Sequence, residues 1–250
     1  MKDVRVIGNR ILRFKVIDST NEKAKELLDE AVDEGTVVVA ESQAAGRGRY
    51  GRAWFSPRGG LYLSIILRPK ERNVQLLSLL SGLPVVKAAS AWSVNPVLKW
   101  PNDILVGGKK LGGILCEGVY RHNSFYAIVG IGVNTANDLS RLPEEIRATA
   151  TSLKLETGKQ IDNEDFLDHL CRQYEAFHDR YVAGETERLV QEYRQLCSTL
   201  GKTVTVETAK GKVKGRAVDV SPLGALIVES GGKRVEVYEG TVLDATTASH

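Results

Sequence analysis

Gly46-Arg47-Gly48-Arg49-Tyr50-Gly51-Arg52 is the stretch on which the choice of fold turns, because its glycines match the GxGxxG spacing of dinucleotide-binding proteins. That spacing binds a dinucleotide only where a helix begins at the glycines and presents its N-terminus to the pyrophosphate. Here Trp54-Phe55-Ser56-Pro57 continues as loop. A P-loop is excluded as well, since neither Lys-Ser nor Lys-Thr follows the last glycine. The stretch therefore argues against both of these nucleotide-binding folds.

The same loop places three arginines among three glycines, on a backbone that is free enough to wrap around an anion. We therefore interpret it as part of a binding site for an anionic small molecule. A solvated basic loop that contacts RNA, or nothing at all, is the alternative. RNA-binding surfaces usually add stacking aromatic side chains and broad basic areas. Only Tyr50, Trp54 and Phe55 are available for stacking here.

The composition is that of an ordinary globular protein, with 42% hydrophobic and 26% charged residues. A chain of 250 residues is long enough for one substantial domain and a small second one. The net charge of +3 argues against an extended nucleic-acid footprint. The sequence has neither a signal-peptide core nor an apolar run long enough to span a membrane. Cys116, Cys171 and Cys197 are too widely spaced for a zinc site or a disulfide framework, so we expect a reducing, cytoplasmic location.

Ser19-Thr20-Asn21-Glu22 predicts the start of a helix, because Ser19 and Glu22 match a capping box. Apolar residues at helical spacing then predict an amphipathic helix that ends at Gly35, namely Ala24, Leu27, Leu28, Ala31 and Val32. Capping alone would explain the polar residues at the start. The same helix start also offers hydroxyls, an amide and free backbone N–H groups to a ligand. Both interpretations stay open.

Short apolar runs predict strands and longer periodic runs predict helices. The predicted strands cover residues 36–40, 61–67, 97–100, 113–117 and 126–131. The predicted helices cover residues 74–92, with a kink or a restart at Pro84, then 162–182 and 185–196. After Gly201 the pattern changes to period two with intervening turns, which predicts a small barrel of four or five short strands. We expect one domain over residues 1–200 and a second over residues 201–250.

Three further segments combine turns with groups that can bind a ligand. Lys99-Trp100-Pro101-Asn102-Asp103 ends a strand with proline and two short polar side chains, which a simple turn also explains. Lys109-Lys110-Leu111-Gly112-Gly113-Ile114-Leu115 sets a lysine pair directly before a buried strand, so one lysine is a candidate for stabilising phosphate charge. Gly130-Ile131-Gly132-Val133-Asn134 allows close approach by a ligand, or equally by another backbone.

Taken in order, these segments resemble the biotin protein ligase family. The resemblance rests on Ser19-Thr20-Asn21, Glu41-Ser42-Gln43, the Gly46–Arg52 loop, Lys99–Asp103, Lys110–Leu115 and Gly130–Asn134. It implies an α+β fold, in which a mixed β-sheet catalytic domain with packed helices, class II synthetase/biotin-lipoate ligase-like, is followed by a small SH3-like β-barrel. The chain is similar to the short form of the family, without the N-terminal DNA-binding domain, so no DNA partner is expected.

The resemblance also implies a reaction and its site residues. Biotin is activated with ATP to biotinyl-5'-AMP and is then transferred to the ε-amine of a lysine on a biotin carboxyl carrier protein. Lys110, Arg49 and Arg47 are the implied catalytic residues. The implied biotin-binding residues are Ser19, Thr20, Asn21, Gln43, Gly46, Arg47, Gly48, Arg49, Lys110 and Gly113. The implied ATP-binding residues are Arg49, Trp54, Asn102, Lys110 and Asn134.

Biotin and ATP are thus the expected substrates, and Mg²⁺ is expected to accompany ATP on its phosphate oxygens rather than in a protein cage. A homodimer paired through sheet edges is a further hypothesis, and no membrane partner is expected. Two alternatives remain. A lipoate ligase or octanoyl transferase shares the catalytic architecture, and a small-molecule sensor or RNA-binding module would use the basic loop without turnover.

Overall fold

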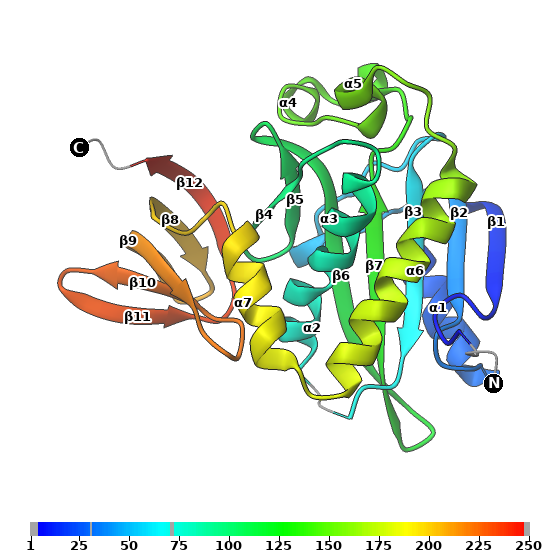
Figure 1. Ribbon diagram of the computed structural model, residues 1–250, viewed down its shortest axis with the longest axis horizontal. Helices are drawn as coiled ribbons and strands as arrows, with labels where there is room; N and C mark the ends of the chain where they lie inside the picture. Colours follow the sequence, from blue (N-terminus) through cyan, green and yellow to red (C-terminus); the bar gives the residue numbers. More distant parts are fainter. Residues whose placement is uncertain (1–4, 31, 71–72, 248–250) are drawn as a thin grey trace.

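The computed structural model describes residues 5–30, 32–70 and 73–247 and contains two sheets (Figure 1). The first is seven-stranded, in the order β1-β2-β3-β7-β6-β5-β4. Its strands are β1 (Ile11–Ile17), β2 (Val37–Gln43), β3 (Leu61–Leu67), β4 (Val97–Lys99), β5 (Asp103–Val106), β6 (Lys109–Arg121) and β7 (Ser124–Val133). The β1–β2 pair is parallel and the other pairs are antiparallel, so the sheet is mixed, as expected.

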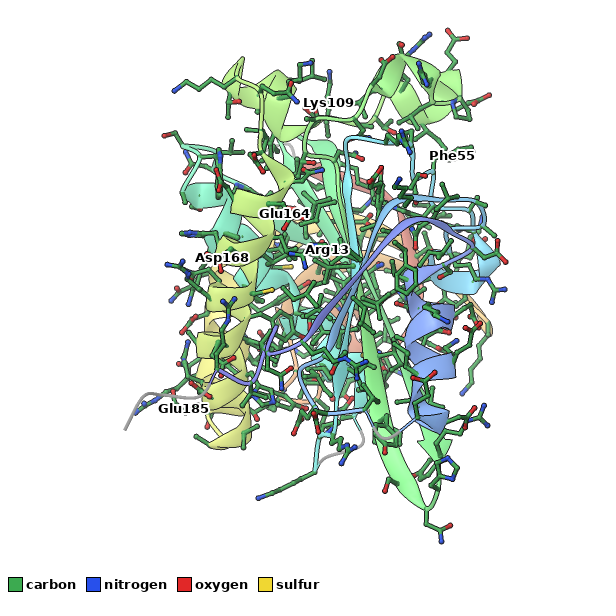
Figure 2. The ribbon with its side chains drawn as sticks, turned by 90° about the vertical axis from the view of Figure 1, so that its right-hand side faces the viewer. Arg13, Phe55, Lys109, Glu164, Asp168 and Glu185 are labelled. Carbon is green, nitrogen blue, oxygen red and sulfur yellow. The ribbon has the colours of Figure 1, made fainter. Side chains whose placement is uncertain are left out.

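Helices cover both faces of this sheet. They are α1 (Thr20–Glu26), α2 (Val74–Leu80), α3 (Gly82–Ser90), α4 (Glu144–Arg147), α5 (Leu153–Thr157), α6 (Asn163–Val182) and α7 (Thr186–Leu196), with 3₁₀ turns at Leu27–Asp29, Arg49–Gly51 and Leu139–Arg141. Figure 2 shows α1 on one side of the sheet and α6 on the other. In Figure 1, α2 and α3 lie on the same side as α6, and α4 and α5 lie together at one end.

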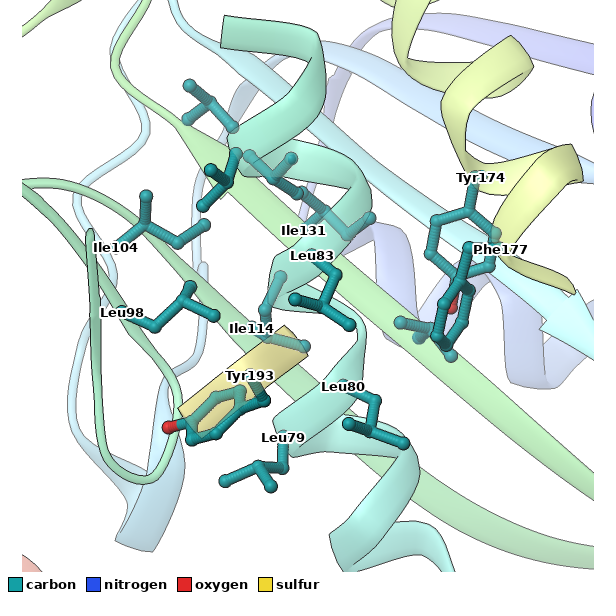
Figure 3. Close-up of a cluster of buried hydrophobic side chains, with 14 of the residues drawn as sticks. Leu79, Leu80, Leu83, Leu98, Ile104, Ile114, Ile131, Tyr174, Phe177 and Tyr193 are labelled. Atoms are coloured by element: carbon teal, nitrogen blue, oxygen red, sulfur yellow. The ribbon is translucent and has the colours of Figure 1, made fainter. Parts of the chain in front are cut away.

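The two faces of the sheet bury separate apolar clusters. Along β7, Tyr126 and Ile128 point toward α1, whereas Val129 and Ile131 belong to the larger cluster with α2, α3 and α6. Figure 3 shows part of this larger cluster around Leu83. Because β3 is covered on both faces, all of its residues are buried. This explains why β3 was recognisable in the sequence as a continuous apolar run.

Several predicted elements are confirmed. The strand predicted over residues 61–67 is β3, and the helices predicted over 162–182 and 185–196 are α6 and α7. The helical segment 74–92 is two helices, with Ser81 between them. Pro84 lies in the first turn of α3, where its missing N–H costs little. The strands β1 and β5 and the short helices α4 and α5 were not predicted.

The prediction for the first helix is wrong in two respects. Ser19 is the N-cap, but within the described residues its side chain makes no capping hydrogen bond, so the capping box does not form. The α-helix ends at Glu26, and Leu27–Asp29 continues as a 3₁₀ turn. Leu27 and Leu28 are nevertheless buried as the periodicity required, because a 3₁₀ turn continues the same apolar face. Ala31 lies outside the described residues.

The C-terminal sheet is five-stranded and antiparallel, in the order β11-β10-β9-β8-β12. Its strands are β8 (Lys202–Thr208), β9 (Gly211–Val220), β10 (Leu226–Ser230), β11 (Lys233–Val237) and β12 (Thr241–Thr247). The expected small β domain is present, but as an open sheet rather than a closed barrel. Its edge strands β11 and β12 pair with β10 and β8, and within the described residues they do not pair with each other. Closure needs that last ladder.

The C-terminal sheet is attached to the larger sheet through α7 and the end of β4 (Figure 1). Arg194 of α7 donates to the Val220 carbonyl at 2.9 Å from Nε. The indole Nε1 of Trp100 donates to the Gly224 carbonyl at 3.0 Å. Trp100 is 1% exposed, so this bond is shielded from water. The small sheet is therefore held against the segment that follows β4.

Within the described residues, no helix combines the length and the apolar character that crossing a membrane requires.

Candidate functional site

On the face of the large sheet that α1 covers, the side chains of β3 and β7 change from apolar to small and polar along the strands. At one end Ile66 and Ile128 pack beneath α1. Further along, the same face carries Ser64 on β3 and Gly130 and Gly132 on β7, because side chains alternate between the two faces of a strand. The N-terminus of α1 lies beside this second region. A hollow floored by small and polar residues thus begins where the apolar contact with α1 ends.

The glycines of the floor are required by the side chains that lie on them. A Cβ atom at Gly130 would collide with the carboxamide of Asn21. A Cβ atom at Gly132 would come within 2.5 Å of the indole Nε1 of Trp54. Gly113 is the partner of Gly132 on β6, and a Cβ atom there would meet the Trp54 ring at 3.6 Å. The indole therefore lies flat across two neighbouring strands.

Above this floor is a cavity of about 180 Å³. It brings together eleven of the residues that the sequence singled out, namely Ser19, Thr20, Asn21, Gln43, Arg47, Gly48, Arg49, Trp54, Asn102, Lys110 and Gly113. Arg49 and Lys110, two of the implied catalytic residues, line the same cavity. Gly46 and Asn134 do not line it.

Both exceptions support the walls of the cavity. A Cβ atom at Gly46 would lie 2.7 Å from the Ser56 hydroxyl oxygen, so this glycine lets the start of the loop pack against Ser56. Asn134 is 5% exposed and its backbone N–H donates to the Leu111 carbonyl at 2.8 Å. Its side-chain amide donates to the Lys110 carbonyl at 3.5 Å. Asn134 thus holds the strand that carries Lys110.

One end of the cavity is polar and uncharged. The backbone N–H of Thr20 donates to Gln43 Oε1 at 2.8 Å, and the Thr20 hydroxyl oxygen lies 3.2 Å from the same atom. Gln43 Nε2 donates to the Ser56 hydroxyl at 2.7 Å. These bonds fix which end of the Gln43 amide faces each neighbour. Thr20 is 4% exposed, so its hydroxyl is shielded from bulk water.

The other end of the cavity is cationic. Lys110 Nζ lies 2.5 Å from Asp103 Oδ1 and 5.3 Å from the centre of the Trp54 ring. Asp103 is the one carboxylate among the described residues that line the cavity, whereas five of them are basic: Arg47, Arg49, Arg52, Lys99 and Lys110. A site with this balance favours anionic ligands over cationic ones.

The two predicted catalytic arginines lie at the rim. Arg49 Nη1 donates to the Gly240 carbonyl at 3.1 Å, and its guanidinium stacks on the Tyr50 ring at 4.9 Å. Arg47 is more exposed, with 58% of its side chain accessible, and donates to Glu22 Oε1 at 3.1 Å. Both guanidinium groups are therefore near the cavity but held by protein oxygens in this conformation.

Sequence reasoning missed part of the lining. Asp103 belongs to the Lys99–Asp103 segment, which the sequence indicated as a possible ligand site. Its ion pair with Lys110 depends on the β5–β6 pairing, and β5 was not predicted. Gly240, Thr241 and Val242, at the start of β12, also line the cavity. Nothing local in the sequence marks these three residues, because they reach the site through the placement of the whole C-terminal sheet.

The cysteines do not take part in the site. Burial raises the pKa of the Cys171 thiol to about 11 and moves the pKa of Cys116 upward as well, although nearby Arg5 opposes the shift at Cys171. Such thiols are poor nucleophiles at neutral pH. Within the described residues, no group of three or more His, Cys, Asp or Glu side chains is arranged to hold a metal ion.

Comparison with known proteins places the chain in a class of ligases. Residues 13–134 match the Biotin/lipoate A/B protein ligase family, and residues 199–243 match the Biotin protein ligase C terminal domain. A biotin--[acetyl-CoA-carboxylase] ligase of Mycobacterium tuberculosis is 35% identical, over 94% of this chain and 90% of its own. A bifunctional ligase/repressor BirA of Bacillus spizizenii is 32% identical, over 95% and 74%.

The same class appears among solved structures. A biotin protein ligase from Aquifex aeolicus, solved in complex with biotin and ATP, has a TM-score of 0.83 at 31% identity, covering 96% of this chain and 99% of that one. The chain belongs to the biotin protein ligase family.

Proposed function

We propose that the protein is an ATP-dependent biotin protein ligase, which makes biotinyl-5'-AMP and transfers biotin to a lysine of a biotin carboxyl carrier protein. The observation that carries the proposal is that one cavity has both an uncharged hydrogen-bonding end at Thr20 and Gln43 and a cationic end that Arg49 and Lys110 line. The family membership and the ligands of the Aquifex aeolicus relative support it.

The two ends of the cavity suit the two ends of biotin. Ser19, Thr20 and Gln43 surround the ureido ring, and Arg47, Gly48 and Arg49 close over the carboxylate. Asn102, Trp54 and Lys110 meet the nucleotide, with Gly113 beneath them and Gly46 and Asn134 as supports. Asn21 lines the cavity, but its carboxamide is already bonded to the protein, so we assign it a supporting role.

The first step joins two anions. A carboxylate oxygen of biotin attacks the α-phosphorus of ATP, and pyrophosphate leaves with the electrons of the broken P–O bond. At ~4 Å the repulsion between two unit charges is about 4 kcal/mol at an effective dielectric constant of ~20. Lys110 and the arginines offset this repulsion and stabilise the charge that develops at the α-phosphate. The carrier amine then attacks the acyl carbon and AMP leaves.

Mg²⁺ is part of this proposal as the companion of ATP. The lining residues fit an ion that is held mainly by phosphate oxygens, because Asp103 is the single carboxylate that the described lining offers. Bound there, the ion would neutralise charge on the departing pyrophosphate. We also propose a cytoplasmic location, the division into residues 1–200 and 201–250, and a homodimer through the open edge at β1.

Incubation of a biotin carrier domain with the protein, ATP, Mg²⁺ and biotin tests the proposal. Mass spectrometry should detect one added biotinyl group, with stoichiometric pyrophosphate release. Lipoate and octanoate in parallel reactions separate the biotin ligase from the lipoate ligase or octanoyl transferase. Salt-sensitive RNA binding without consumption of ATP would instead favour the binding-module alternative.

A further inference from the structure

A network of hydrogen bonds connects the glycine-arginine loop to the face of β6 through α1. Arg47 Nη1 and Lys25 Nζ both donate to Glu22 Oε1, at 3.1 and 3.0 Å. Lys25 Nζ also donates to Glu117 Oε1 at 2.8 Å. Glu117 lies on the same face of β6 as Gly113, beyond the edge of the cavity. Its carboxylate is thus one terminus of the network.

The second oxygen of Glu117 leads back toward the ligand site. Asn21 Nδ2 donates to Glu117 Oε2 at 2.7 Å, and more weakly to the Leu115 carbonyl at 3.3 Å. The Ser64 hydroxyl oxygen lies 2.6 Å from Asn21 Oδ1 and 2.8 Å from the Thr20 hydroxyl oxygen. Asn21, Ser64 and Thr20 are each at most 4% exposed, so water does not substitute for these partners.

The hydrogen-bonded series Glu117–Asn21–Ser64–Thr20, which we call the relay, ends at a carboxylate. The Glu117 carboxylate determines the direction of each hydrogen bond in the relay. A carboxylate only accepts, so it holds the N–H₂ end of the Asn21 amide toward Glu117 and the carbonyl end toward Ser64. That carbonyl accepts the single hydroxyl proton of Ser64. Ser64 must then accept from Thr20. The contact between the Thr20 and Ser64 hydroxyl oxygens, at 2.8 Å, is also shorter than the 3.2 Å between the Thr20 hydroxyl oxygen and Gln43 Oε1, so the Thr20 proton is assigned to Ser64.

The relay determines which hydrogen-bonding group Thr20 offers to a ligand in the cavity. With its own proton committed to Ser64, the Thr20 hydroxyl oxygen faces the ligand as an acceptor and calls for an N–H donor. A cyclic urea presents N–H groups, whereas the dithiolane of lipoate and the chain of octanoate have none. The buried relay therefore favours a ureido ring over the ring or chain of the related acids.

We propose that Glu117 is a positioning and specificity-determining residue, which acts through Asn21 and Ser64 to set Thr20 as the acceptor for an N–H group of the ligand. This inference rests on the proposed function. Lys25 neutralises the carboxylate from its other side without changing the direction of the relay, so it serves as an internal comparison.

The test compares four proteins in steady-state biotinylation: wild type, Glu117→Gln, Ser64→Ala and Lys25→Gln. In Glu117→Gln the new side-chain amide can turn either end toward Asn21, so only the longer bond to the Leu115 carbonyl still favours the original direction. We expect KM for biotin to rise about fivefold in Glu117→Gln and in Ser64→Ala, with kcat and KM for ATP within about twofold. Lys25→Gln should leave KM for biotin within about twofold, since the Asn21–Glu117 bond remains.

The double variant gives an independent readout. Because Glu117 and Ser64 act in one relay, Glu117→Gln in the Ser64→Ala background should add little to KM. An unchanged KM for biotin in active Glu117→Gln or Ser64→Ala protein overturns the inference, as does an equal loss of kcat and of ATP affinity. If Glu117→Gln does not fold, Ser64→Ala alone decides by the same criterion. A wild-type protein that does not transfer biotin overturns the proposed function itself.

Discussion

Lys110 Nζ and Asp103 Oδ1 lie 2.5 Å apart across the β5–β6 hairpin, at the cationic end of the cavity. The hairpin has a register shift between Ile104 and Leu105, next to the partner of Lys110. The Lys110 backbone is also held, because its N–H donates to the Thr149 carbonyl at 2.7 Å and its carbonyl accepts from Thr151 at 2.9 Å. The ammonium group is thus positioned from both the backbone and the side chain.

Replacement of Lys110 by alanine should lower the rate of adenylate formation by ~10² or more, because one preorganised charge at the α-phosphate is lost. Pyrophosphate release in a single turnover measures this step. Lys109→Ala is the matched control, since Lys109 is adjacent but exposed and absent from the described lining. Equal pyrophosphate release by wild type and Lys110→Ala would remove the assigned role.

Asp103→Asn keeps the shape of the side chain but removes the charge that anchors Lys110. We expect kcat for adenylation to fall about tenfold, as the ammonium loses its fixed position. The effect should disappear in the Lys110→Ala background, because the two residues act as a pair. Asp138→Asn, at an exposed position, controls for the change in net charge. Additive effects in the double variant would contradict the pairing.

The glycine-arginine loop should become protected when both substrates are bound. Tyr50 has a left-handed backbone, with φ at 57°, and is 59% exposed, so the tip of the loop is not packed into the core. Closure over an anionic ligand would cover the bonds after Arg47, Arg49 and Arg52. Trypsin cleavage there should slow with biotin and ATP, whereas cleavage after Lys210 in the β8–β9 turn should not. Equal cleavage with and without substrates contradicts closure.

A carboxylate far from the site should make stability depend on pH. Burial raises the pKa of Glu34, but hydrogen bonds with His178 and with the Arg68 backbone N–H outweigh burial, and the net pKa lies below the usual 4.5. A lowered pKa in the folded state means that the stabilisation is present above about pH 4.5 and is lost as the pH falls through the folded-state pKa.

Glu34→Gln should therefore lower the free energy of unfolding by about 1 kcal/mol at pH 7. The difference from wild type should shrink as the solution is acidified below the usual glutamate range. Urea unfolding at a series of pH values measures this. Glu26→Gln, on an exposed ion pair, is the control. A difference that stays constant down to low pH would contradict the assigned pKa direction.

The predictable part of the fold was the part in which a local pattern matches a buried environment. The Leu61–Leu67 run became β3 because both faces of that strand are covered. The apolar residues at helical spacing between Phe166 and Tyr181 became the packed face of α6. The capping box at Ser19 failed because a local motif cannot report a competing tertiary contact. Ser19 lines the cavity, and Asn21 is bonded to β6.

The sequence by itself determined the chemistry that is available: a glycine-rich loop with three arginines, a lysine before a buried strand, and hydroxyl and amide groups at a helix start. Such features depend on neighbouring residues, so their spacing is visible along the chain. Only the tertiary structure decided which of them meet. Arg49 reaches Gly240 across 191 positions, and Asn21 reaches Glu117 across 96, because strand pairing and sheet placement bring together residues whose distance in sequence carries no signal.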